Sequence, residues 1–270
     1  MKKSSTTSLF ICAVLVLVTA SSCYYPGYTD PYIVDVSRQK ENYYYTPAVA
    51  TTPMLVSKND FSMILNGVLA DNANGGSVHA AFMPSKNIGL MTSYSWLKND
   101  QGSDDVGRFL NYEAGAGYIG KLSSYWHFET YGGMNGGKVE NTHHTGYSKI
   151  KTNGFFLQPT IFVSNKDQRV QFGFISRFNL AKFNLADTSF NNDREPIVTQ
   201  QMLLIHDNPS QLFWEPGFVF RAGWKNFQLN AAYSFSNDLS NKEIFRKKDL
   251  FTLGVVVRLN ASNIETKKKN

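Results

Sequence analysis

The sequence predicts an all-β protein, an antiparallel up-and-down transmembrane β-barrel of about ten strands. Three observations lead to this fold class. Segments of roughly ten residues alternate between apolar side chains and small or polar ones, which is the two-residue period of a strand. The apolar positions are rich in aromatic side chains, since the 270 residues include 20 Phe and 14 Tyr while only 18% are charged. The connections between the segments alternate between short and long.

The clearest pair of segments is a hairpin at residues 213–235, FWEPGFVFRAGWKNFQLNAAYSF. In its second arm Phe227, Leu229 and every second residue up to Phe235 share one face, and small or polar residues occupy the other. A soluble barrel would bury the apolar face. A membrane barrel would instead turn that face to lipid and fill its lumen with the small and polar side chains.

The first residues of the chain predict a secretory signal. Two lysines precede an apolar core at residues 9–18, which has the length of a signal peptide and is too short for a spanning helix. Small residues directly before Cys23 resemble the lipobox of bacterial lipoproteins, although Ala20 stands where that pattern usually has Leu. The resemblance implies that residues 1–22 are removed and that Cys23 carries acyl chains such as palmitate. The alternative is an ordinary signal beside an incidental cysteine.

Residues 23–59 are predicted to be an extended, irregular tether, because they contain four prolines and no sustained period. Two interpretations stay open, a mobile spacer and a segment packed against or into the barrel mouth. Residues 261–270 are predicted to be a polar, basic tail. Five lysines of the leader and tail account for most of the net charge of +6, so the remaining balance of about +1 predicts no surface for nucleic acid.

Residues 60–260 contain the predicted barrel. Its ten strands are residues 61–70, 77–83, 88–97, 109–120, 125–136, 154–164, 168–180, 213–223, 227–235 and 250–259. The connections after the second, fourth, sixth and eighth strands have about three to five residues, and the others are longer and polar. This alternation is typical of bacterial outer-membrane barrels, with turns in the periplasm and loops outside. It predicts that both barrel termini are periplasmic, where an inner-leaflet anchor on Cys23 would also lie. Eight or twelve strands are the alternatives, with a hidden pair in residues 181–211.

Together, the signal with Cys23 and the ten segments resemble the small lipid-anchored or OmpA-like β-barrel proteins of Gram-negative outer membranes. The rival fold is a lipocalin-like soluble barrel with its apolar face inward. The polar faces argue against it, because they are rich in Gly, Ala and Ser and poor in the Lys and Glu that a water-facing surface needs.

Several ionisable residues fall on the predicted lumen face. They are Glu113, His127, Glu129, Arg177, Glu215, Arg221 and Arg258, with His79 as a further member. Because a barrel of this size is largely filled by its own side chains, we expect these groups to pair across the lumen. The alternative is a proton or ion path, or an acid–base pair of His127 and Glu129, for which the sequence offers no nucleophile.

Other polar residues suggest no site. His143 and His144 are adjacent and lack a third ligand, so we expect no metal, and no motif predicts a cofactor or a catalytic residue. Asp104-Asp105 and His206-Asp207 match only weakly the loop residues of outer-membrane proteases. The predicted function is a structural or accessory role in the outer membrane, as a subunit of an envelope assembly or a surface-loop binder. Its expected partners are outer-membrane lipids and other outer-membrane or periplasmic proteins. The alternatives are a lipid- or peptide-directed hydrolase and a narrow pore.

Overall fold

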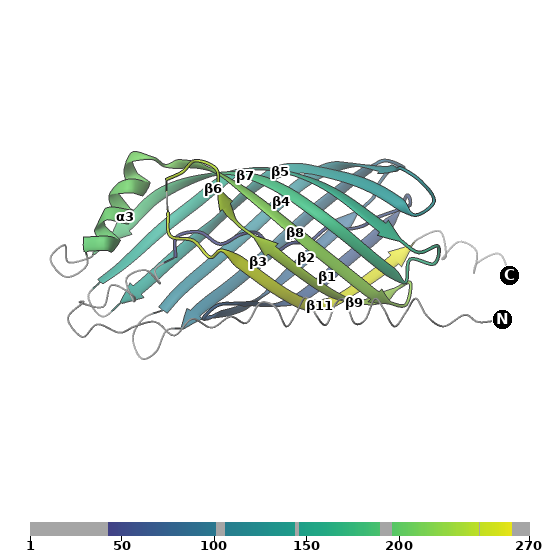
Figure 1. Ribbon diagram of the computed structural model, residues 1–270, viewed down its shortest axis with the longest axis horizontal. Coiled ribbons are helices and arrows are strands. Elements are labelled where there is room, and N and C mark those ends of the chain that lie inside the picture. The colour runs from purple at the N-terminus through teal and green to yellow at the C-terminus, as the bar shows by residue number, and fades with distance from the viewer. Residues whose placement is uncertain (1–42, 101–105, 144–145, 190–195, 243, 261–270) are drawn as a thin grey trace. The chain divides into compact units, whose positions relative to one another are not determined.

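In the computed structural model, long antiparallel strands form a closed barrel (Figure 1). The structure describes residues 43–100, 106–143, 146–189, 196–242 and 244–260. The long strands are β1 (Asp60–Ala70), β2 (Ala73–Phe82), β3 (Ile88–Asp100), β4 (Val106–Lys121), β5 (Trp126–His143), β6 (Gly146–Ser164), β7 (Val170–Thr188), β8 (Ser210–Gly223), β9 (Phe227–Phe235) and β11 (Asp249–Asn260). The short β10 (Asn237–Asp238) pairs with β8, and the helix α3 (Pro196–Asp207) lies between β7 and β8 in the chain.

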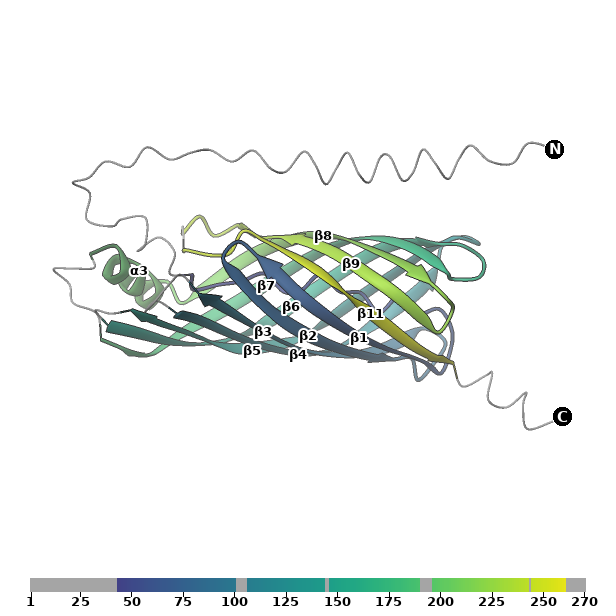
Figure 2. The same cartoon turned by 90° about the horizontal axis from the view of Figure 1, so that it is seen from below.

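Each long strand pairs with its neighbours in sequence, and the pairing of the last strand with the first closes the ring. β11 pairs with β1, with Met63 opposite Val257, and β8 pairs with β9, with Phe220 opposite Ala231. The strands cross the barrel obliquely (Figure 2), as closure of a sheet requires. The predicted ten-stranded up-and-down barrel is therefore confirmed.

Side chains alternate between the exterior and the lumen along the strands. On β7 Phe172, Phe174 and Phe178 are exposed, whereas Gln171 and Arg177, which have the opposite parity, are buried. The exterior apolar side chains include Leu65, Leu90, Tyr94, Trp96, Tyr112, Phe155, Leu157, Phe218, Phe220, Leu229 and Leu253. The apolar face therefore points outward, opposite to a lipocalin-like soluble barrel.

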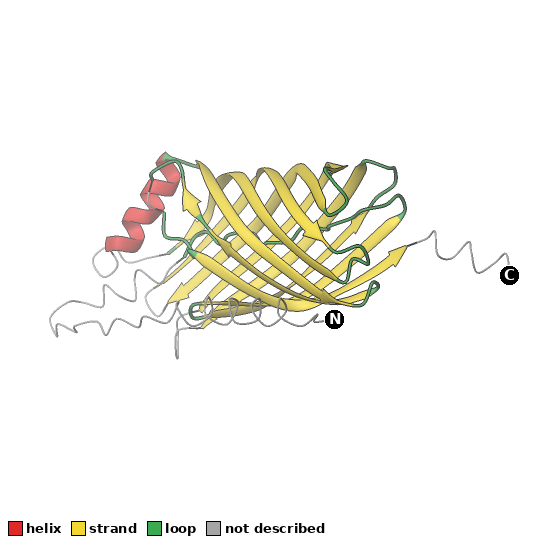
Figure 3. Ribbon diagram, turned by 45° about the vertical axis from the view of Figure 1, so that its right-hand side comes forward, coloured by secondary structure: helices red, strands yellow, loops and turns green. Residues whose placement is uncertain are grey.

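The two ends of the barrel differ. The turn end carries the connections 83–87, 122–125, 165–169 and 224–226, and there Asp60 of β1 pairs with Asn260 of β11. The other end, here called the α3 end, carries the helix α3 and the described residues of the connection 236–248. Figure 3 shows the helix at one end and the arrowhead of β11 at the other.

The prediction of long loops after the first, third and fifth strands is wrong. β1 and β2 are joined by Asp71 and Asn72 alone, and β5 reaches His143 before β6 begins at Gly146. The polar residues expected in loops continue the strands instead. Hydrogen bonds between strands need no apolar face, so pairing can extend beyond the apolar part of the barrel.

The described part of residues 181–211 contains no hidden pair of strands. β7 continues to Thr188, and α3 follows, burying Val198, Met202 and Ile205. These positions are four and three residues apart, which is the spacing of one helical face. Among the described residues no helix is long and apolar enough to cross a membrane.

Residues 43–58, here called the plug, are packed among lumen-facing side chains of the barrel. Tyr44, Thr52, Met54 and Leu55 are almost completely buried. This part of the predicted tether is therefore not a mobile spacer, and the alternative of a segment inside the barrel describes it. The signal, Cys23 and the basic tail lie outside the described residues.

Candidate functional site

The plug begins at the α3 end, where aromatic side chains and backbone hydrogen bonds hold it. The Tyr45 ring stacks on Phe213 of β8, with 3.8 Å between the ring centroids. The Tyr44 amide donates to the Phe245 carbonyl at 2.8 Å, and the Lys247 amide donates to the Tyr45 carbonyl at 2.9 Å. The connection 236–248 thus pairs with the plug as it enters the lumen.

A buried ion cluster lies beneath this entrance. Arg177 of β7 donates from Nη2 to Glu113 Oε1 of β4 at 2.5 Å. Its Nε lies 3.1 Å from Glu215 Oε2 of β8, an ion pair without the alignment of a hydrogen bond. The Tyr45 hydroxyl donates to Glu215 Oε1, and Asn179 Nδ2 donates to the Tyr45 oxygen at 2.5 Å. One plug side chain therefore joins a cluster built from three strands.

Two further arginines bind the plug backbone. Arg221 of β8 donates to the carbonyls of Thr52 and Pro53, the latter at 3.1 Å. Arg258 of β11 donates to the Met54 carbonyl at 3.0 Å. Both guanidinium groups are buried. Backbone carbonyls and the side-chain amide oxygens of Asn230 and Gln171 accept these hydrogen bonds, so the direct partners of both arginines are uncharged.

Strand side chains also satisfy other polar groups of the plug. Glu129 Oε1 accepts the Met54 amide at 3.3 Å, and Gln158 Nε2 donates to the Thr51 carbonyl at 2.9 Å. Thr51 Oγ1 lies 2.9 Å from His79 Nδ1. A buried segment that belongs to no sheet must find such partners, because each unpaired backbone group would cost about 1–3 kcal/mol.

Two glycines make room for the plug on the lumen wall. A Cβ atom at Gly217 of β8 would lie 2.9 Å from the Cβ of Ala50, and one at Gly173 of β7 would lie 2.7 Å from Met54 Cε. Both distances are shorter than carbon–carbon van der Waals contact. The small residues of the predicted lumen face thus leave space for the plug in addition to the strands' own side chains.

The structure divides the predicted lumen residues into three groups. Arg177, Glu113 and Glu215 meet in one cluster, while Arg221, Arg258, Glu129 and His79 contact the plug. His127 is separate: its ring stacks on Phe162 at 4.9 Å, and its Nε2 lies 3.5 Å from Ser164 Oγ. His127 and Glu129 thus have different partners, and Glu129 faces plug backbone instead of an open substrate position.

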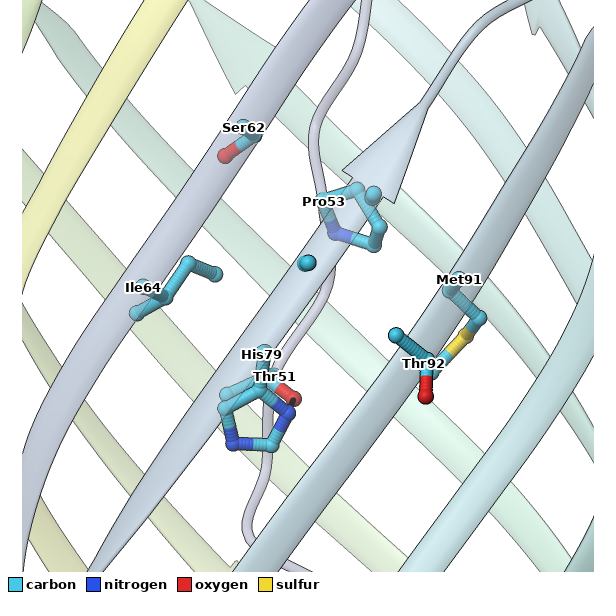
Figure 4. Close-up of a pocket in the computed structure, with 9 residues that line it drawn as sticks. Thr51, Pro53, Ser62, Ile64, His79, Met91 and Thr92 are labelled. Carbon is cyan, nitrogen blue, oxygen red and sulfur yellow. Dashed lines mark hydrogen bonds between the residues drawn. The ribbon is translucent and has the colours of Figure 1, made fainter.

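The spaces beside the plug are small. A cavity of about 10 Å³ lies between the plug and β1, β2 and β3, next to Thr51, Pro53 and His79 (Figure 4). A second cavity, of about 30 Å³, lies beside Tyr44 and Tyr45. The first has room for about one water molecule and the second for about two. Neither is large enough for an organic substrate.

The remaining candidate residues form no site among the described residues. His144, Asp104 and Asp105 lie outside them, and the side chain of His143 is not described. His206 and Asp207 are exposed at the end of α3. Within the described part of the chain, no group of three or more His, Cys, Asp or Glu side chains could hold a metal ion.

No protein-family model and no curated protein matches the sequence. The solved structures that match are distant. The translocator domain of autotransporter NalP from Neisseria meningitidis is 9% identical with a TM-score of 0.45, covering 77% of this chain and 90% of that one. Ail, the attachment invasion locus protein of Yersinia pestis, is 13% identical with a TM-score of 0.33, covering 75% and 99%. A major outer membrane protein from Thermus thermophilus is 10% identical with a TM-score of 0.32, covering 74% and 99%.

These likenesses place the chain in no family. What the barrel does must therefore be inferred from its own geometry.

Proposed function

We propose that the chain is a lipid-anchored protein of the bacterial outer membrane whose plugged barrel has a structural or accessory role. It would serve as a subunit of an envelope assembly or carry surface loops that bind a partner. The observation that carries this proposal is the occupied lumen, where Arg221, Arg258 and Glu129 bind the plug backbone. A barrel with a filled interior has little space for transport or for a substrate.

The exterior of the barrel supports a membrane location. Its exposed side chains form an apolar surface that would be costly in water and suits lipid. Near the turn end Tyr118, Tyr125, Trp126 and Trp224 are exposed, as in the aromatic girdle at a membrane interface. The longest connections lie at the α3 end, which favours that end as the outer one.

The lengths of the strands support the same orientation. β5 has 18 residues and β6 has 19, whereas a tilted strand crosses the hydrocarbon with about 9–11. The extra residues lie largely at the α3 end, where polar pairs such as Asn141 and Ser148 continue the ladder. This extension would project from the membrane and offer a surface for a partner.

The lipid anchor is part of the proposal and rests on the small residues before Cys23. Two or three acyl chains on this cysteine would suffice for stable anchoring. Cells fed a clickable fatty acid are expected to label the wild-type protein, and Cys23→Ala is expected to lose the label. A Ser22→Ala variant, which keeps the cysteine, is the control. An unlabelled wild type, or label that survives Cys23→Ala, would contradict the anchor.

Purification in a mild detergent followed by planar-bilayer recording tests the proposed role. We expect the chain to elute with another envelope protein and to produce no steady conductance steps, because the plug closes the lumen. A known porin reconstituted at the same protein-to-lipid ratio is the positive control. Steady steps from the wild-type protein would favour a pore, and a chain that always elutes alone would argue against the accessory role.

A further inference from the structure

The plug connects the two ends of the barrel. Tyr44 and Tyr45 are held by Phe245, Lys247 and Phe213 at the α3 end. Tyr44 lies sixteen positions before Asp60, which begins β1 at the turn end. An extended chain of that length spans about 50 Å, more than the hydrocarbon thickness of about 30 Å. The plug is therefore long enough to cross the membrane inside the barrel.

Hydrogen bonds fix where the plug ends. The Val56 and Ser57 amides donate to Asp60 Oδ2 at 3.2 and 2.9 Å. The Asn59 amide donates to the Met83 carbonyl at 2.7 Å, and Met83 belongs to the connection between β2 and β3. The chain thus runs from the α3 end to the turn end before the first strand begins.

The closed ring prevents a sideways exit. β1 pairs with β11 over ten positions, and β8 pairs with β9 over seven. The chain can therefore leave the lumen only at the two ends of the barrel. The residues that precede Tyr43 must continue from the α3 end, whereas those that follow Asn260 continue from the turn end.

The preceding segment cannot cross back through lipid outside the barrel. Residues 24–42 contain Pro26, Pro31 and several charged side chains. In the bilayer core every unpaired backbone group costs several kcal/mol, so only helices and closed barrels span it. Such a segment has to stay on the membrane face where it leaves the barrel.

We infer that the barrel is the conduit of its own N-terminal segment and displays residues 23–42 on the membrane face opposite its C-terminus. With the α3 end outside, that face is the cell surface, and an acylated Cys23 inserts into the outer leaflet. This replaces the inner-leaflet anchor expected from the sequence. The inference rests on the proposed outer-membrane location, and it adds a further function, the export of the chain's own anchor.

Epitope tags on the two sides of the barrel test the inference. One tag is inserted between Gly27 and Tyr28, and a second follows Asn270, in separate full-length chains. On intact cells an antibody is expected to bind the first tag, and the second only after the outer membrane is permeabilised. A soluble periplasmic protein with the same tag is the control for cell integrity.

Single cysteines provide a second test in case a tag prevents folding. Ser37→Cys is expected to react with a membrane-impermeant maleimide on intact cells, and Thr266→Cys only after permeabilisation, with the wild-type chain as the control for Cys23. Equal accessibility of the two sites overturns the inference. The reverse pattern supports passage through the barrel and inverts the proposed orientation. If both sites are protected while bilayer recordings show a closed barrel, the display fails and the plugged barrel stands.

Discussion

Arg177→Met is expected to lower the free energy of unfolding by about 3–5 kcal/mol, a large part of the stability of an ordinary domain. The substitution leaves Glu113 and Glu215 buried without their shared cation, since Arg177 contacts both carboxylates. It also removes the guanidinium that lies 4.1 Å from the centre of the Phe156 ring. The cost arises from unpaired buried charge, because Met has nearly the volume of the removed side chain.

Urea unfolding of the barrel in lipid vesicles, followed by the heat-modifiable shift on gels, measures this loss. Arg108→Met is the matched control, because Arg108 is an exposed arginine of β4, and a change within about 0.5 kcal/mol is expected there. Adding Glu113→Gln and Glu215→Gln to Arg177→Met should restore much of the stability. If Arg177→Met behaves like Arg108→Met, the cluster does not stabilise the barrel as described.

The strands could be predicted from the sequence because the apolar exterior and the polar lumen of the barrel impose a strict alternation. Phe218 and Phe220 point outward and Arg221 points inward, as their positions in the period require. The same parity predicted which ionisable residues face the lumen. It could not predict their partners, since Arg177 and Glu113 are 64 residues apart and their contact depends on the curvature of the closed sheet.

The sequence left the plug as one of two interpretations of the tether, because the segment has no period of its own that would decide between them. Its contacts are made one side chain at a time, as where Tyr45 meets Glu215 from 170 positions away. The prolines that favour an extended tether also suit a segment that belongs to no sheet. One feature of the sequence favoured the plug. The tyrosines at 43–45 have large, partly apolar side chains that gain from burial, and a mobile spacer would leave them exposed.

The α3 end was predicted least well. Strand pairing beyond the apolar part of the barrel needs no apolar alternation, so the polar extensions of β5 and β6 resemble loops in the sequence. The helix could have been predicted, because Val198, Met202 and Ile205 repeat with helical spacing. Treating residues 181–211 only as a long connection or a hidden pair of strands missed that repeat.

We expect the plug to fill the lumen of the barrel in the cell. Ala50 and Gly217 offer a direct probe, since a Cβ at Gly217 would lie 2.9 Å from the Cβ of Ala50. Disulfides have Cβ atoms about 3.5–4.5 Å apart, so an outward shift of about 1 Å would accommodate the bond. Phe218, the next residue of β8, is exposed on the exterior and provides a matched control.

The decisive measurement is the migration of the Ala50→Cys/Gly217→Cys chain on denaturing, non-reducing gels after mild oxidation of intact cells. A plugged barrel predicts a faster band that a reductant abolishes, because the bond closes a loop of 168 residues. The pair Ala50→Cys/Phe218→Cys and each single variant should keep the mobility of the wild type. If the first pair forms no bond, or both pairs shift alike, the plug does not occupy the lumen of the barrel in the cell.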